Sequence, residues 1–389
     1  MKEIYLDNSA TTRISEAALE EYVRVSRECF GNPSSLHKMG FDSESVIKDA
    51  KESVIRSLGA KGASVIFTAS GSEANNLAVI GRALSKERYK RGAKIMVTEG
   101  EHASVEECCR SLEKSGYKVA RIPTTRGRID MDRLRAELTP DLILVSMMLV
   151  NNETGAFYDT AAVSSLVKRI CPDAFIHIDA TQAYLKIPFT QGSVGADMIT
   201  ISSHKISGPK GVGALVVSDK VIKARGLSPV ILGGGQGGGL RSGTENVPGI
   251  AAFAKAVDEG FGKCREVYAK CNALRDYLLE KLNTLPSLSE ISPTLPDRHA
   301  PHILNITLPK IKSETMLHYL SSRGIFVSSG SACSSNTHHT SSALIAYGRS
   351  ESEADCSIRI SFNYTNERED VDELCTALTD GLSKLARIR

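Results

Sequence analysis

The stretch Ala196-Asp-Met-Ile-Thr-Ile-Ser-Ser-His-Lys-Ile-Ser-Gly-Pro-Lys-Gly211 decides the fold that this sequence predicts. It begins as a strand, because 198–201 is apolar and favours extended structure. The strand stops at Ser202-Ser-His-Lys205 before a Gly-Pro turn, and 212–217 predicts a returning strand. A lysine held by rigid walls at such a turn loses hydration, which lowers its pKa and makes the amine a nucleophile. Taken alone, the stretch also fits an ordinary solvated turn lysine.

The composition is that of a globular protein. The chain has 389 residues, of which 41% are apolar and 24% charged, enough for two domains around a large core. The net charge of +3 is too small to favour a nucleic-acid or anionic-membrane partner, and no apolar run reaches the roughly 20 residues of a membrane helix. The start lacks an apolar signal core, and the nine cysteines are most simply reduced thiols, so we expect a cytoplasmic protein. Without a Cys-x-x-Cys pair, we expect no metal site.

Strands and helices alternate along the first two thirds of the chain. The predicted strands are 64–68, 94–98, 142–150, 175–178 and 198–201. The helices between them include 43–58 and 74–84. This alternation predicts an α/β fold with a mostly parallel sheet covered by helices on both faces. A long helical pattern over 248–285 then leads to strands near 302–308 and 357–362, which predict a smaller α+β domain.

Unusual polar residues follow each of the five predicted strands. They are Ser70-Gly71-Ser72, His102, Asn152, Asp179 with Gln182, and Ser202 with His204 and Lys205. Open α/β sheets bind their ligands at the carboxyl ends of the strands. The sequence therefore predicts one shared pocket.

The residue types in this set suit one cofactor. Ser70-Gly71-Ser72 opens a helix whose N-terminus can hold a phosphate, whereas an ordinary N-cap would explain one serine only. An aspartate can pair with a protonated ring nitrogen, a lysine can form a Schiff base with an aldehyde, and a histidine can stack on a ring. Together these groups describe a site for pyridoxal phosphate. The alternatives are a capping or core role for His102 and a capping role for Asp179.

The second region adds two candidate residues. Cys333 lies among small polar residues in Val327-Ser-Ser-Gly-Ser-Ala-Cys-Ser-Ser335, and an exposed thiol there can ionise and attack, although most lone cysteines are inert. Arg359 can bind a carboxylate with two parallel hydrogen bonds; an exposed strand arginine is the commoner alternative. His338-His339 cannot complete a metal site by themselves.

Five motifs, in their order and spacing, resemble those of the cysteine desulfurases of the NifS/IscS type. These belong to the class V aminotransferase group of fold-type-I pyridoxal phosphate enzymes. The motifs are Tyr5-Leu-Asp-Asn-Ser-Ala-Thr-Thr12, Phe30-Gly-Asn-Pro-Ser-Ser35, Ser203-His-Lys-Ile-Ser-Gly-Pro-Lys-Gly211, Arg241-Ser-Gly-Thr-Glu-Asn246 and Ser328-Ser-Gly-Ser-Ala-Cys333. The resemblance implies a large cofactor-binding domain over 15–255, built on a sheet of the seven-stranded type. It also implies a small domain made of 1–14 and 256–389.

The resemblance implies a role for each polar residue at the strand ends. Lys205 would hold the cofactor as a Schiff base and later move protons, Asp179 would pair with the pyridinium, and His102 would stack on the ring. Gln182 and Asn152 would lie near the ring oxygen. The phosphate would be held by Gly71, Ser72, Ser202 and His204.

The resemblance also implies the substrate and the partners. Arg359 and Asn152 would bind the carboxylate of L-cysteine, and Cys333 would attack its sulfur, leaving L-alanine and a protein persulfide. Thr244 would reach the phosphate of a neighbouring subunit, which implies a homodimer. The sulfur would pass to an acceptor protein, an iron–sulfur scaffold or a sulfur carrier, for iron–sulfur cluster, thio-cofactor or tRNA assembly.

Three departures from the family pattern concern the acceptor rather than the cofactor site. Gly237-Gly-Gly239 replaces polar residues, Asn336-Thr-His-His-Thr-Ser-Ser342 replaces an apolar stretch, and the sequence stops at Arg389 without a docking tail. Two alternative functions stay open. One is a related lyase or aminotransferase that acts on selenocysteine, cysteine sulfinate or another amino acid. The other is a sulfur-relay protein with negligible turnover.

Overall fold

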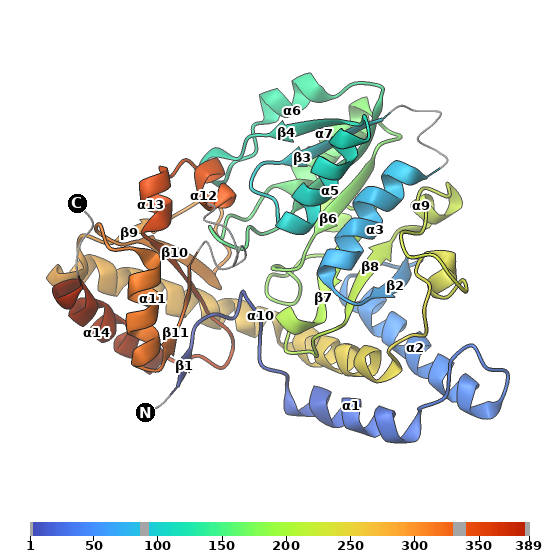
Figure 1. Cartoon of the computed structure of the whole chain (residues 1–389), viewed down its shortest axis with the longest axis horizontal. Helices are drawn as coiled ribbons and strands as arrows, with labels where there is room; N and C mark the ends of the chain where they lie inside the picture. The colour runs from blue at the N-terminus through green and yellow to red at the C-terminus, as the bar shows by residue number, and fades with distance from the viewer. Residues whose placement is uncertain (1–2, 86–92, 330–339, 386–389) are drawn as a thin grey trace.

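The computed structural model describes residues 3–85, 93–329 and 340–385, and its centre is a seven-stranded sheet (Figure 1). The strand order is β2-β8-β7-β6-β5-β3-β4. Their bounds are β2 Ser64–Thr68, β3 Lys94–Thr98, β4 Lys118–Ile122, β5 Leu142–Met148, β6 Phe175–Asp179, β7 Met198–Ser202 and β8 Gly213–Val217. Only β8 runs antiparallel to its neighbours β7 and β2. The mostly parallel seven-stranded sheet is confirmed.

Helices cover both faces of this sheet because its central strands are apolar on both sides. In β7, Met198 belongs to the core that also contains residues of α3 (Gly71–Leu84) and α5 (Ala103–Lys114), whereas Ile199 and Ile201 belong to the core on the opposite face. That core also contains residues of α2 (Lys38–Ser57), α7 (Thr160–Ile170) and the first half of α10 (Val247–Thr284). The strand ends are therefore held by two apolar layers.

Two predicted helix starts are wrong. Helix α2 begins at Lys38 instead of residue 43, because the ring of His37, an uncommon capping residue, accepts a hydrogen bond from the Gly40 N–H at 3.4 Å. Helix α3 begins at Gly71 instead of residue 74, since the Ser70 hydroxyl caps it through the Glu73 N–H at 3.1 Å. The Ser70-Gly71-Ser72 motif therefore opens helix α3, as a phosphate site at its N-terminus requires.

The smaller α+β domain is also confirmed. Its four-stranded sheet has the order β12-β13-β10-β9, with bounds β12 Ser328–Ser329, β13 Ser357–Ser361, β10 Ile303–Thr307 and β9 Ser292–Thr294. A separate core joins this sheet to α11 (Ser313–Ser322), α14 (Arg368–Lys384) and the second half of α10. The remaining helices of more than three residues in the described part of the chain are α1 Glu16–Glu28, α6 Met131–Glu137, α8 Gln191–Val194, α9 Asp219–Lys223, α12 Ser342–Tyr347 and α13 Glu351–Asp355.

The first residues of the chain pack in the small domain, and the chain then continues into the large domain. Strand β1 (Ile4–Tyr5) pairs with β11 (Ile325–Phe326), and Leu6 is buried in the small-domain core. Helix α10 contributes to both cores, with Val267 the first of its residues in the second one. We therefore propose the division given by the sequence, 15–255 and 1–14 with 256–389, with one boundary inside α10. Within the described residues no helix has the length and apolarity needed to cross a membrane.

Candidate active site

A cavity of about 280 Å³ lies at the carboxyl ends of β2, β3, β5, β6 and β7. It is lined by every residue predicted from the strand ends: Ser70, Gly71, Ser72, His102, Asn152, Asp179, Gln182, Ser202, His204 and Lys205. Arg359, on β13 of the small domain, lines it as well. The cavity thus lies where the two domains meet.

Two predicted site residues are not among the described residues of this lining. Thr244 is exposed on the loop before α10 and does not line the cavity of this chain, as far as the described residues go. Cys333 lies outside the described residues, as does the pair His338-His339. The role of each stays a prediction.

Sequence reasoning missed several lining residues: Ser9, Ala10, Asn75, Ser104, Met148, Val150 and Thr181. A helical repeat could have indicated Asn75, because it lies one turn after Gly71 and Ser72 on the same helix. Ser9 and Ala10 belong to the recognised motif Tyr5-Leu-Asp-Asn-Ser-Ala-Thr-Thr12. Their side chains do not predict that their backbone carbonyls accept hydrogen bonds from Lys205.

Lys205 ends a short 3₁₀ turn, Ser203–Lys205, that follows β7 directly. Its amine donates hydrogen bonds to the carbonyl oxygens of Ser9, at 2.5 Å, and Ala10, at 2.8 Å. The same N-terminal segment is joined to the turn by the Thr12 hydroxyl, which donates to the His204 carbonyl at 2.9 Å. The lysine amine is therefore held at the cavity wall by backbone acceptors.

Asp179 is a buried carboxylate at the end of β6. One oxygen accepts a hydrogen bond from the Asn75 amide at 2.8 Å, and the other accepts one from the Thr181 N–H at 2.9 Å. Both donors are neutral, so these two hydrogen bonds do not compensate the negative charge of the carboxylate. Such a group attracts a protonated ring nitrogen.

The two histidines of the cavity are held neutral. Burial lowers the pKa of His102, and the Nδ1 atom of this residue caps α5 by accepting from the Ser104 N–H at 3.1 Å. The capping alternative is therefore correct, and His102 lines the cavity as well. Burial, with the nearby Lys205 charge, lowers the pKa of His204 to about 4. Neither ring then adds positive charge near pH 7.

Several polar atoms in the cavity are buried without a partner among the described residues. They include the Ser202 hydroxyl and the Gln182 amide oxygen. A Cβ atom placed on Gly71 would lie 3.3 Å from both Ser202 Cβ and Thr181 Oγ1, so the lack of a side chain keeps this corner open. The first N–H groups of α3 have no intrahelical acceptor. The corner therefore presents donors of the kind that can bind an anion.

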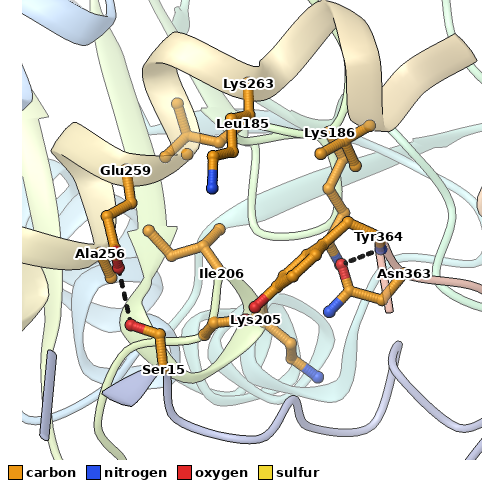
Figure 2. A pocket seen from close by; sticks show the side chains of 13 residues that line it. Ser15, Leu185, Lys186, Lys205, Ile206, Ala256, Glu259, Lys263, Asn363 and Tyr364 are labelled. Atoms are coloured by element: carbon orange, nitrogen blue, oxygen red, sulfur yellow. Dashed lines mark hydrogen bonds between the residues drawn. The ribbon is translucent and has the colours of Figure 1, made fainter. Parts of the chain in front are cut away.

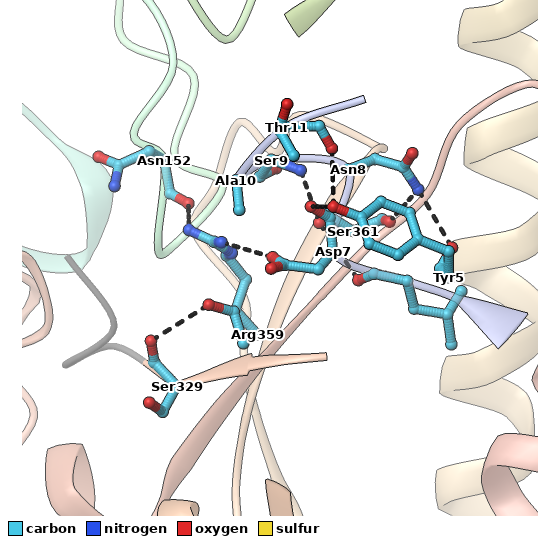
Figure 3. Close-up of polar contacts among 12 residues, drawn as sticks. Tyr5, Asp7, Asn8, Ser9, Ala10, Thr11, Asn152, Ser329, Arg359 and Ser361 are labelled. Carbon is cyan, nitrogen blue, oxygen red and sulfur yellow. Dashed lines mark hydrogen bonds and ion pairs between the residues drawn. The ribbon is translucent and has the colours of Figure 1, made fainter. Parts of the chain in front are cut away.

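Arg359 is buried, so the alternative of an exposed strand arginine is wrong. Its Nη1 atom donates to the Asn152 carbonyl at 2.9 Å, and its Nη2 atom pairs with Asp7 Oδ1 at 2.8 Å. Its Nε atom is buried without a partner among the described residues. Figure 3 shows the guanidinium between Asn152 and Asp7.

A second cavity, of about 70 Å³, shares Lys205 with the first (Figure 2). Glu259, whose carboxylate accepts from the Ser15 hydroxyl at 2.7 Å, lines it from α10. Lys186 lines it too, and its amine is buried with no partner in the described part of the chain. Burial first, and then the positive charges of Lys205 and Arg359, lower the pKa of Lys186 to about 7.

The model of the aminotransferase class-V family matches residues 4–374. The chain belongs to this family. It is 36% identical to the NifS/IcsS protein homolog of Lactobacillus delbrueckii subsp. bulgaricus, over 99% of this chain and 98% of the relative. It is also 36% identical to cysteine desulfurase IscS 1 of Archaeoglobus fulgidus, over 98% and 97% of the two chains. These relatives confirm the resemblance seen in the motifs.

Solved structures of similar proteins superpose over nearly the whole chain. A NifS-like protein has a TM-score of 0.90 at 33% identity, covering 99% of this chain and 100% of the other. SspA in complex with cysteine has a TM-score of 0.79 at 29% identity, covering 93% and 99%. The predicted fold class is thereby confirmed.

Proposed function

We propose that this protein is a pyridoxal phosphate-dependent cysteine desulfurase, which converts L-cysteine into L-alanine and keeps the sulfur as a persulfide on Cys333. The observation that carries the proposal is the meeting of Lys205, Asp179 and Arg359 in one cavity. A nucleophilic amine, an anion for a ring nitrogen and a carboxylate-binding cation are what a cofactor-assisted reaction of an amino acid requires. The names of the curated relatives support the same reaction.

The residues present fit pyridoxal phosphate. The phosphate would lie in the corner made by Gly71, Ser72 and Ser202, where a buried hydroxyl lacks a partner and the start of α3 offers free donors. Asp179 would pair with the ring nitrogen, and Gln182, whose amide oxygen has no partner among the described residues, would lie near the ring oxygen. When bound, pyridoxal phosphate supplies an electron sink for the bonds at the substrate α-carbon.

The chain's own groups would then bind the substrate and move its protons. Arg359 would bind the α-carboxylate, and Lys205, once released as an amine, would carry a proton to and from the α-carbon. The neutral ring of His102 would cover the cofactor face. The Cys333 thiolate would attack the substrate sulfur: the sulfur–carbon bond breaks, a sulfur–sulfur bond forms, and protonation of the remaining carbon frame gives L-alanine. An acceptor protein would later take the persulfide sulfur.

The first test compares wild type with Cys333→Ser. We expect both proteins to be yellow, because Cys333 plays no part in holding the cofactor in this proposal. Wild type should form L-alanine from L-cysteine, and sulfide when a thiol reductant is added, whereas the variant should lose both activities by roughly 10²-fold or more. Equal alanine formation in the two proteins would favour a related lyase or aminotransferase. A colourless wild type that added cofactor cannot restore would contradict the proposal as a whole.

We further propose that the enzyme is a homodimer in which Thr244 completes the partner's phosphate site. Thr244 is exposed here, and three consecutive apolar side chains of the preceding loop are exposed as well: Val230 is 38% exposed, Ile231 39% and Leu232 79%. Monomeric proteins seldom expose such groups together. The loop with Leu232 is joined to the loop with Thr244 by the bridge between Ile231 and Arg241. A second copy covering this surface would explain both observations.

Leu232→Asp should weaken the dimer, because a charge would be buried in the proposed interface. We expect sedimentation equilibrium to find wild type as a dimer and the variant shifted toward monomer, with weaker cofactor retention since Thr244 is then withdrawn. Leu295→Asp, at a residue 49% exposed in the small domain, is the matched control and should stay dimeric. A monomeric wild type that retains its cofactor would rule out this arrangement.

A further inference from the structure

One short turn, Asp7–Ala10, contacts the two basic residues of the cavity that come from different domains. Its Asp7 carboxylate pairs with Arg359 at 2.8 Å, and its Ser9 and Ala10 carbonyls accept from Lys205. We propose that Asp7 is a positioning residue for substrate recognition, which holds the guanidinium of Arg359 in the orientation that receives the α-carboxylate of the substrate. This inference rests on the proposed function.

Asp7 is itself held firmly. Its carbonyl accepts hydrogen bonds from the Ala10 N–H at 3.0 Å and from the Tyr5 hydroxyl at 3.1 Å, and its backbone bridges Ser361 of β13 (Figure 3). The next residue, Asn8, donates to the Ser361 carbonyl at 2.9 Å. Ser361 lies two positions after Arg359 on the same strand. The carboxylate is thus fixed relative to the strand that carries the arginine.

The pairing leaves the arginine able to bind a second carboxylate. A guanidinium has five N–H groups, and its contacts with Asp7 and the Asn152 carbonyl use two of them, which leaves three as far as the described residues go. Nε is among the atoms without a partner in the described residues. A substrate carboxylate needs two parallel N–H groups. Arg359 can therefore bind Asp7 and the substrate at once.

The position of Asp7 points to orientation rather than to contact with the substrate. Arg359 lines the cavity, whereas Asp7 is not among its described lining residues. Arg359 is only 4% exposed, and Lys186 and Lys205 are further basic groups close enough to interact electrostatically. The Asp7 carboxylate supplies a negative charge to this basic region. A buried arginine without this partner would turn toward other acceptors, because an unpaired buried charge is costly.

Accurate placement of Arg359 matters because Lys205 acts on the same small molecule. The α-carbon of an amino acid is bonded directly to its carboxylate. The position at which Arg359 binds the carboxylate therefore fixes where Lys205 can reach the α-carbon. The single turn Asp7–Ala10 contacts both residues and sets their separation. A misplacement of about 1 Å can lower the efficiency of a reaction on the order of 10²-fold.

The test compares wild type with Asp7→Ala and Asp7→Asn. We expect Asp7→Ala to raise the KM for L-cysteine on the order of 10²-fold, while kcat changes less. Asp7→Asn keeps an acceptor oxygen and should restore part of the loss. Binding of L-alanine, followed by the absorbance of the bound cofactor, should weaken in parallel with KM. Binding of cysteamine, which has no carboxylate, should be the same in all three proteins. Asp258→Ala, which removes the surface partner of Arg56 at 2.6 Å, is the control and should match wild type.

Two results would overturn the inference: an unchanged KM with unchanged L-alanine binding, or an equal loss of cysteamine and L-alanine binding, which would indicate a general structural defect. Failure of the proposed function looks different, because wild type would then bind L-alanine without forming it from L-cysteine. The comparison of L-alanine with cysteamine would still decide the role of Asp7. A wild type that binds neither amine would contradict both.

Discussion

Lys205→Ala should abolish the conversion of L-cysteine to L-alanine, by at least about 10⁴-fold. The change removes the only group proposed to bind the cofactor covalently and the group proposed to move the α-proton. The cavity itself should persist, because the hydrogen bonds of Asp179 with Asn75 and Thr181 do not involve the lysine. The variant should therefore still bind pyridoxal phosphate, but reversibly.

Three measurements check this expectation. Mass spectrometry after borohydride reduction should find the cofactor attached to wild type and absent from the variant. Dialysis should remove the cofactor from the variant alone, and an alanine assay should find no turnover. Lys210→Ala is the matched control, since that lysine is exposed and lies five residues further along. Borohydride labelling of the Lys205 variant would mean that another lysine holds the cofactor.

Lys186→Met should stabilise the protein at neutral pH, an unusual result for a substitution in the interior. The amine of Lys186 is buried and has no partner among the described residues, and burial lowers its pKa from 10.5 to about 7. In the unfolded chain the same amine is protonated up to about pH 10.4. Between these values the unfolded state binds one more proton than the folded state, so folding stability is lost as the pH falls.

The size of this stabilisation follows from the shift in the pKa of Lys186 on folding. A difference of 10.5 − 7 = 3.5 pKa units corresponds to at most about 5 kcal/mol at 1.36 kcal/mol per unit. The gain in free energy of unfolding should be greatest at and below pH 7 and should fade toward pH 10.5. Urea unfolding of both proteins at several pH values measures it, with Lys210→Met as the exposed control. A gain that does not vary with pH would indicate improved packing instead of relief of the buried amine.

Much of the fold could be predicted because the central strands carry strong local signals. Strands β2, β3 and β7 were predicted nearly residue by residue, since each is apolar and bounded by polar turns. Strand β4 was missed, because it lies at the sheet edge and only Ile122 of its five residues is fully buried. Its sequence, Lys-Val-Ala-Arg-Ile, lacks the apolar run of a central strand.

The candidate site was predictable where it depends on strand ends and not where it depends on distant contacts. Asp179 and Lys205 stand at the ends of recognisable strands. The partner of Asp179, Asn75, lies 104 residues away along the chain, and the partner of Arg359, Asp7, lies 352 residues away. No local pattern encodes such a pairing. The lack of a partner for Lys186 among the described residues is likewise a property of the folded interior only.

The N-terminal turn also sets the order in which the pocket can be completed during synthesis. Asp7 and Asn8 contact Arg359 and Ser361, which leave the ribosome some 350 residues later. At about 5–20 residues per second, the first segment must wait tens of seconds for its partners. Strands β2 to β8 can associate during that time, but the acceptors of Lys205 are not yet anchored to β13. Uptake of the proposed cofactor should therefore be a late event, which follows translation of the last strand instead of guiding the first domain as it folds.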